Sequence, residues 1–185
     1  SPIVFEDKVF VTCYSGYGDG SEGNLNDLKR HLICLSRDAG KILWETTVSS
    51  SSPEDRYSGY ITEHGYASST PVTDGTAVYC FFGKSGVHTF DMAGKPLWHT
   101  SVGTSSGNRR WGSAASPIVF GDLVIVNASE ESRAVVALDK KTGKQVWKAE
   151  GRNLELCYGT PVVHEVPGKK PELVLALDRK STRLN

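Results

Sequence analysis

One pattern occurs three times in this chain of 185 residues, and each copy ends on a tryptophan. In each copy a polar turn with a Gly-Lys pair joins two short apolar runs, and the tryptophan follows the glycine by four residues. The copies are Cys34–Trp44, Thr89–Trp98 and Ala137–Trp147. In the second copy, Asp91 and Gly94 occupy the first and fourth positions that a type I turn favours. Each copy therefore predicts a β-hairpin.

A second pattern precedes each hairpin. A Ser-Pro or Thr-Pro step begins a short apolar run, which is followed by a polar turn and a second apolar run rich in β-branched residues. The prolines are Pro2, Pro71, Pro117 and Pro161; the last three are 46 and 44 residues apart, and an insertion accounts for the longer first gap. Repeats of forty-odd residues are typical of four-stranded propeller blades.

The two patterns together predict an all-β fold, a partial β-propeller of four-stranded antiparallel blades with three blades plus part of a fourth. No segment shows a sustained helical period, and the one helix-like piece, residues 24–30, is short and polar. We expect blades at about residues 1–48, 66–102 and 112–150, with a partial blade at about 157–178. Residues 179–185 show no strand pattern and are expected to form a tail outside the repeat.

Composition excludes several classes of function. The 21 basic and 21 acidic side chains cancel, so no overall field attracts nucleic acid. No apolar run approaches the roughly 20 residues that span a bilayer. The four cysteines form no CxxC pair, which argues against a metal site. We expect them to be free thiols packed as small apolar groups, the alternative being a disulfide such as Cys13 to Cys34.

The three tryptophans, Trp44, Trp98 and Trp147, are predicted to be structural. A tryptophan carries a large apolar area with one N–H group to satisfy, which suits a wedge between adjacent sheets. The third copy matches the pattern A-x-D-x-x-T-G-x-x-x-W at every specified position, through Ala137, Asp139, Thr142, Gly143 and Trp147.

This pattern is the tryptophan-docking motif of the pyrroloquinoline-quinone-type (PQQ-like) β-propeller repeats, and the chain resembles that family over residues 1 to about 177. The first copy keeps the glycine and the tryptophan but departs at Cys34, Ser36 and Ala39. The second keeps Asp91, Gly94 and Trp98 with one residue fewer. Family members close rings of seven or eight blades, so the resemblance implies open blade faces here, which missing blades or another copy of the chain would cover.

The resemblance implies three classes of function. The first is a non-catalytic scaffold that binds a protein, as in the lipoprotein propeller that helps assemble outer-membrane proteins, and the other two are a PQQ- and Ca²⁺-dependent dehydrogenase and the sensor domain of a larger kinase-type protein. The dehydrogenases use a channel aspartate and often a Cys-Cys pair, but this sequence has no Cys-Cys pair and no aspartate that can be assigned as a base. We therefore favour the scaffold, with no catalytic residue, no cofactor and no metal. The sequence carries no localisation signal, and the resemblance implies a periplasmic or extracytoplasmic location.

Candidate binding residues lie in the loops that enter each proline strand and join the second and third strands, because these loops share one face of a propeller. An aromatic residue precedes three of the Ser/Thr-Pro steps, and aromatics beside Arg and His can stack on a flat ligand or form the centre of a protein interface. The alternatives are that the aromatics fill the space between blades and that the arginines are solvated. The candidates are Tyr57, His64, Tyr66, Arg109, Arg110, Trp111 and Tyr158.

The glycine-rich insertion at residues 14–24 falls on the same face. Its neighbouring oxygen side chains could bind Ca²⁺, but their spacing lacks the EF-hand pattern, and a mobile flap is the simpler interpretation. The side chains are those of Asp19, Ser21, Glu22, Asn24 and Asp27.

Overall fold

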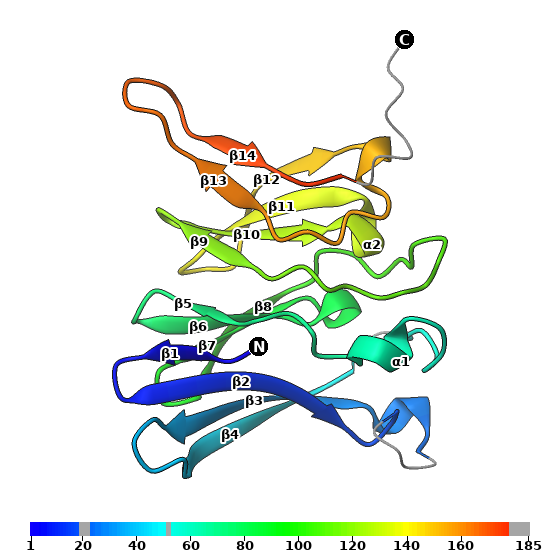
Figure 1. Ribbon diagram of the computed structural model, residues 1–185, viewed down its shortest axis with the longest axis vertical. Helices are drawn as coiled ribbons and strands as arrows, with labels where there is room; N and C mark the ends of the chain where they lie inside the picture. The colour runs from blue at the N-terminus through cyan, green and yellow to red at the C-terminus, as the bar shows by residue number, and fades with distance from the viewer. Residues whose placement is uncertain (19–22, 51–52, 178–185) are drawn as a thin grey trace.

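The computed structural model describes residues 1–18, 23–50 and 53–177, and in this part of the chain the strands form four separate antiparallel sheets (Figure 1). The first sheet contains β1 (Ile3–Phe5), β2 (Lys8–Ser15), β3 (Lys29–Ser36) and β4 (Ile42–Ser49). The second contains β5 (Val72–Thr73), β6 (Ala77–Phe81), β7 (Val87–Asp91) and β8 (Pro96–Thr100). The third contains β9 (Ile118–Phe120), β10 (Leu123–Ala128), β11 (Ala134–Asp139) and β12 (Gln145–Glu150). The fourth has β13 (Val162–His164) and β14 (Glu172–Val174).

Within each sheet the strands follow one another in chain order, which is the meander of a propeller blade. The expectation of an all-β partial propeller is therefore confirmed. The predicted tail at 179–185 and residues 19–22 of the insertion, with their proposed Ca²⁺ ligands Asp19, Ser21 and Glu22, lie outside the described residues. No helix in the described ranges is long and apolar enough to cross a membrane.

Short helical turns all fall in the connections between the second and third strands of a sheet or between one sheet and the next. They therefore lie at one end of the strands, on the right of Figure 1, which we call the loop face, whereas the hairpins lie at the opposite end. The helix-like piece predicted at 24–30 is limited to three residues, because β3 begins at Lys29. The turns are η1 (Leu25–Asp27), α1 (Ile61–His64), η2 (Gly83–Ser85), α2 (Ser129–Ser132) and η3 (Arg152–Leu154).

The apolar core lies between the sheets. One cluster joins the first two sheets, around Phe10 and Phe90, and a second joins the second and third sheets, around Tyr79 and Val126. A third cluster joins the third and fourth sheets. Because each strand alternates its side chains between two faces, a central sheet contributes to the clusters on both sides.

The tryptophans of the first two hairpins join each sheet to the next one. Trp44 donates its Nε1–H to the carbonyl of Met92 at 3.3 Å, and Trp98 donates to the carbonyl of Lys140 at 3.0 Å. Both carbonyls belong to the hairpin turn of the following sheet, so the indole satisfies its N–H group while its ring covers that turn. Trp147 packs with residues of the fourth sheet, beside a cavity of about 320 Å³.

A threonine lies two residues after Trp44 and two residues after Trp98, and it also bonds the turn of the next sheet. Thr46 donates to the carbonyl of Gly94 at 2.8 Å, and Thr100 donates to the carbonyl of Gly143 at 2.7 Å. The turn itself is held by Asp139, whose Oδ1 accepts from the main chain and the hydroxyl of Thr142. These hydrogen bonds to the charged form, the hydroxyl bond first, lower the pKa of the Asp139 carboxyl.

All four cysteines are free. Cys34 lies opposite Phe10 in the pairing of β2 with β3, whereas Cys13 lies opposite His31, so these two thiols are separated along the strands. The alternative of a Cys13–Cys34 disulfide is therefore wrong. Cys80 is fully buried, and burial alone raises the pKa of its thiol.

Candidate functional site

The loop face carries a cluster of aromatic rings drawn from three different connections. The Trp111 ring lies 4.3 Å from the Tyr60 ring and 5.7 Å from the Tyr158 ring, measured between centroids. The guanidinium carbon of Arg109 lies 4.5 Å from the Trp111 ring, a cation–π contact. We call Tyr60, Arg109, Trp111 and Tyr158 the aromatic ledge.

The ledge is partly open to solvent and is supported from behind. Tyr60 is 56% exposed and Arg109 is exposed, whereas Trp111 is half-buried. His64, from α1, holds the main chain of Trp111 through a 2.8 Å hydrogen bond to its carbonyl. Because a carbonyl can only accept, the proton of this bond resides on Nε2 of His64, and Ser68 bonds the other ring nitrogen at 3.0 Å. His64 thus positions the ledge.

Two other predicted residues, Tyr57 and Tyr66, lie apart from the ledge. Tyr66 is buried against Leu28 and Ile61, and its hydroxyl donates to the carbonyl of Asp55 at 2.7 Å. The Tyr57 ring packs 6.1 Å from the Tyr66 ring. These two tyrosines belong to a small aromatic core beneath the loops.

Arg110 is exposed next to the ledge and adopts a left-handed backbone with φ of 52°. The structure therefore brings together His64, Arg109, Trp111 and Tyr158 and adds Tyr60, which the sequence analysis did not select.

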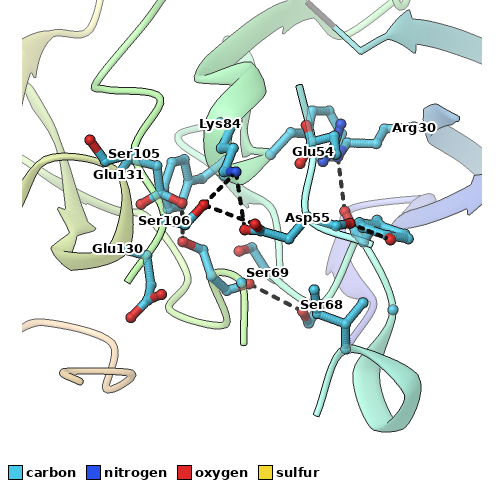
Figure 2. Close-up of a pocket in the computed structure, with 18 residues that line it drawn as sticks. Arg30, Glu54, Asp55, Ser68, Ser69, Lys84, Ser105, Ser106, Glu130 and Glu131 are labelled. Carbon is cyan, nitrogen blue, oxygen red and sulfur yellow. Dashed lines mark hydrogen bonds and ion pairs between the residues drawn. The ribbon is translucent and has the colours of Figure 1, made fainter. Parts of the chain in front are cut away.

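Behind the ledge, six charged side chains line a cavity of about 30 Å³ (Figure 2). In Figure 2, Arg30 and Glu54 lie on one side of Asp55 and Lys84, and Glu130 and Glu131 lie on the other. We call this set the charge cluster; its members are Arg30, Glu54, Asp55, Lys84, Glu130 and Glu131.

Both basic residues of the charge cluster are already paired with a carboxylate of the cluster. Arg30 forms a 2.8 Å ion pair with Glu54, with side chains 2% and 6% exposed, and also bonds main-chain and hydroxyl oxygens nearby. Lys84 pairs with Asp55 at 3.0 Å and donates to Ser106 at 2.7 Å and to the carbonyl of Pro53 at 3.2 Å. An ammonium has three donors, so Lys84 has none left for a further carboxylate.

Within the part of the chain that the structure describes, the two glutamates of α2 have no basic partner of this kind. Glu131 is 2% exposed, its Oε1 accepts from the Ser113 hydroxyl, and its Oε2 has no hydrogen-bond partner among the described residues. Burial raises the pKa of Glu131 to about 7, with the negative charges of Glu130 and Glu54 adding to the effect. The Glu131 carboxyl therefore changes its protonation state near neutral pH.

Glu130 connects the charge cluster to the ledge. Its Oε2 accepts from the main chain of Gly107 at 3.0 Å, and burial raises the pKa of its carboxyl. The Tyr158 hydroxyl is close enough for the Glu130 charge to add to burial in raising the pKa of this phenol. Neither the hydroxyl nor Glu130 Oε1 forms a hydrogen bond with a described residue, so their interaction is electrostatic.

Sequence reasoning did not identify the charge cluster. One available signal was the Glu-Glu pair at 130–131, which interrupts two apolar strands, and another was Lys84, which follows Phe81 and Phe82 closely. Both lie between a second and a third strand. The repeat pattern predicts these connections on the functional face, but the predicted binding residues all lie in the loops before the prolines.

The four sheets in meander order, joined by tryptophans and carrying these residues on one face, define the chain as part of a β-propeller. A family model described as outer membrane protein assembly factor BamB matches residues 3–177, and the chain belongs to this PQQ-type propeller family. The family resemblance seen in the tryptophan motif is thereby confirmed. No curated protein sequence matches the chain.

Solved structures show the same fold at low sequence identity. The chain is similar to BamB from Moraxella catarrhalis, with 21% identity, a TM-score of 0.52, and coverage of 80% of this chain and 40% of that one. A europium-containing methanol dehydrogenase has 18% identity and a TM-score of 0.52, with coverage of 84% of this chain and 25% of that one. The quinohemoprotein alcohol dehydrogenase ADHIIG from Pseudomonas putida HK5 has 15% identity and a TM-score of 0.56, with coverage of 94% of this chain and 30% of that one. The chain thus spans less than half the length of these proteins.

The charge cluster does not fit PQQ or Ca²⁺. A cavity of about 30 Å³ is far below the several hundred Å³ of a typical cofactor pocket, and its excess carboxylates would repel an anionic quinone. Ca²⁺ takes six to eight oxygen ligands, and within residues 1–18, 23–50 and 53–177 no three acidic, His or Cys side chains form a group that could hold a metal ion. Asn24 and Asp27 instead cap η1.

Proposed function

We propose that this chain is a non-catalytic propeller domain that binds a protein partner through the aromatic ledge. The observation that carries the proposal is the cation–π stack of Arg109 on Trp111 beside the exposed Tyr60 ring. Trp, Tyr and Arg are the residues that contribute most often to the centre of protein interfaces. His64 fixes the main chain beneath them, so little ordering entropy is lost on binding.

The family description supports a partner among outer-membrane proteins or their assembly machinery, and with it an extracytoplasmic location. A protein partner also suits the shape of the site. The ledge is a set of partly exposed rings supplied by three loops, which suits a surface contact better than enclosure of a small molecule.

The test measures binding of an unfolded outer-membrane β-barrel protein to the immobilised chain. We expect Tyr60→Ala, Arg109→Ala and Trp111→Ala each to weaken binding about 5-fold or more, the usual effect of losing a central interface residue. Arg37→Ala is the matched control, because Arg37 is an exposed arginine in a hairpin on the opposite face. Equal binding by the ledge variants and the control would refute the proposal.

A parallel arm addresses the dehydrogenase alternative. The chain is mixed with PQQ and Ca²⁺, an alcohol is added, and reduction of a dye is followed. We expect no reduction above a protein-free blank, and alcohol-dependent reduction that requires the protein would overturn the non-catalytic assignment.

We also propose that the open sheets at the two ends bind further blades or a second copy. Apolar side chains on them are more than half exposed, and unpaired sheets of this kind associate readily. These residues are Val4, Ile42, Val162 and Val174. Sedimentation should show a mass that grows with concentration and that Val174→Lys reduces, whereas a monomer at every concentration would contradict self-association.

A further inference from the structure

We propose that the cavity of the charge cluster binds a primary ammonium group, carried by a lysine of the protein partner that the ledge binds. This inference rests on the proposed function and specifies the chemistry of the partner. The argument depends on charge balance, on an unsatisfied buried atom and on the size of the cavity.

The charge balance around the cavity is negative. Arg30 neutralises Glu54 and Lys84 neutralises Asp55, through ion pairs of 2.8 and 3.0 Å. Among the described residues, Glu130 and Glu131 have no basic side chain as an ion-pair partner, and each is 4% exposed or less. A buried carboxylate without a cation is costly and takes up a proton more readily, as the raised pKa of Glu131 shows, so a cation competes with this proton and is favoured above pH 7.

Each glutamate of this pair lines the cavity and has one buried oxygen that accepts no hydrogen bond from the described residues, Oε1 of Glu130 and Oε2 of Glu131. In Glu131, the hydroxyl of Ser113 already occupies Oε1 and holds the carboxylate in place. A donor that enters the cavity therefore meets an acceptor of fixed orientation.

The size of the cavity selects among cations. About 30 Å³ accommodates one or two water-sized groups, which fits an ammonium but not a planar guanidinium or a quaternary ammonium. The ledge adjoins the cavity, because Ile61 and Gly112, the chain neighbours of Tyr60 and Trp111, line it. A lysine stem can pack on these rings while its ammonium reaches the glutamates.

Main chain from the loop before β9 covers Glu130. Gly107 donates to Glu130 Oε2, and a Cβ added at Gly107 would overlap that carboxylate. Binding of an ammonium therefore requires glycine at position 107, because a side chain at this position would displace the Glu130 carboxylate.

The first experiment uses n-butylammonium as a probe of the cavity. We expect n-butylammonium chloride to raise the melting temperature of the chain in a saturable way at pH 8, whereas tetramethylammonium chloride at equal ionic strength does not. Glu130→Gln and Glu131→Gln should each reduce the shift at least by half. Glu63→Gln, an exposed carboxylate of α1, is the matched control and should keep the full shift. Equal shifts with both ammonium salts, or a larger saturable shift with Ca²⁺, would overturn the inference.

The second experiment tests the lysine itself, with the unfolded outer-membrane β-barrel protein as the probe. Acetylation of its lysines removes the charge, and guanidination keeps the charge but enlarges the group. We expect both treatments to weaken binding to the chain about 10-fold. If binding is unchanged by both but is still lost in Trp111→Ala, the lysine inference fails and the proposed function stands. If Trp111→Ala also has no effect, the proposed function fails.

Discussion

The substitution Gly143→Ala tests how the sheets are joined. Gly143 lies in the β11–β12 turn, is buried, and adopts φ of 71°, which an L side chain rarely takes. A Cβ at this position would lie 2.5 Å from Cε3 of Trp98 and 2.8 Å from Oγ1 of Thr100. The new methyl group therefore cannot fit unless the tryptophan or the turn moves.

Two costs add in this variant. Placing alanine in the left-handed region costs about 1 to 2 kcal/mol. Forcing a methyl group into a packed contact costs about 1 to 3 kcal/mol more. We expect Gly143→Ala to lower the free energy of unfolding by about 2 to 5 kcal/mol, of which only the second part comes from the contact between sheets.

Gly40→Ala separates the two costs. Gly40 occupies the same turn position in the first sheet with φ of 64°, but a Cβ there meets no atom within 4 Å. It should lose only the backbone part, about 1 to 2 kcal/mol. Urea unfolding followed by tryptophan fluorescence measures both variants. If Gly40→Ala and Gly143→Ala lose the same free energy, the contact between Trp98 and the next hairpin does not stabilise the fold as argued.

Three further predictions concern the core and the charge cluster. Trp98→Phe removes the indole N–H that Lys140 accepts and should cost about 1 to 2 kcal/mol in the same urea assay, with no loss arguing against the hydrogen bond. Arg30→Ala leaves Glu54 buried without its cation and should cost about 3 to 5 kcal/mol, whereas Arg37→Ala on the surface should leave the midpoint unchanged. Because the folded-state pKa of Glu131 is raised from 4.5 to about 7, the folded chain keeps a proton between these values that the unfolded chain loses. The contribution of this group is therefore present below about pH 4.5 and is lost as the pH rises through 7. Glu131→Gln should gain stability relative to the wild type as the pH rises from 5 to 8, and a constant difference would refute the assignment.

The repeated hairpins were readable because their chemistry is local. An Asp or Ser at the turn, a glycine that takes positive φ and a tryptophan four residues later lie within one short segment, so spacing alone predicts the hairpin. The strands that follow the prolines were predictable for the same reason, because their signal also lies within a few neighbouring residues. The loops were also predictable on one face, since a meander must reverse direction at each connection.

The charge cluster could not be read in this way, because its members come from segments far apart in the chain. Arg30 pairs with Glu54 across 24 positions, and Lys84 pairs with Asp55 across 29, while the nearest acidic neighbours in sequence play no part. The position of Tyr66 also depends on tertiary packing. Like Tyr158 it precedes a Thr-Pro step, but packing against Leu28 and Ile61 buries it in the loop core.

By itself, the sequence determined the all-β repeat, the position of each hairpin and the residues that join one sheet to the next, since each depends on the backbone preferences of a few neighbouring residues. Only the tertiary structure decided which side chains meet on the loop face. Burial and charge pairing depend on how the sheets pack side by side. That packing leaves Glu131 without a cation, exposes Tyr60 and Arg109 on Trp111, and buries Tyr66.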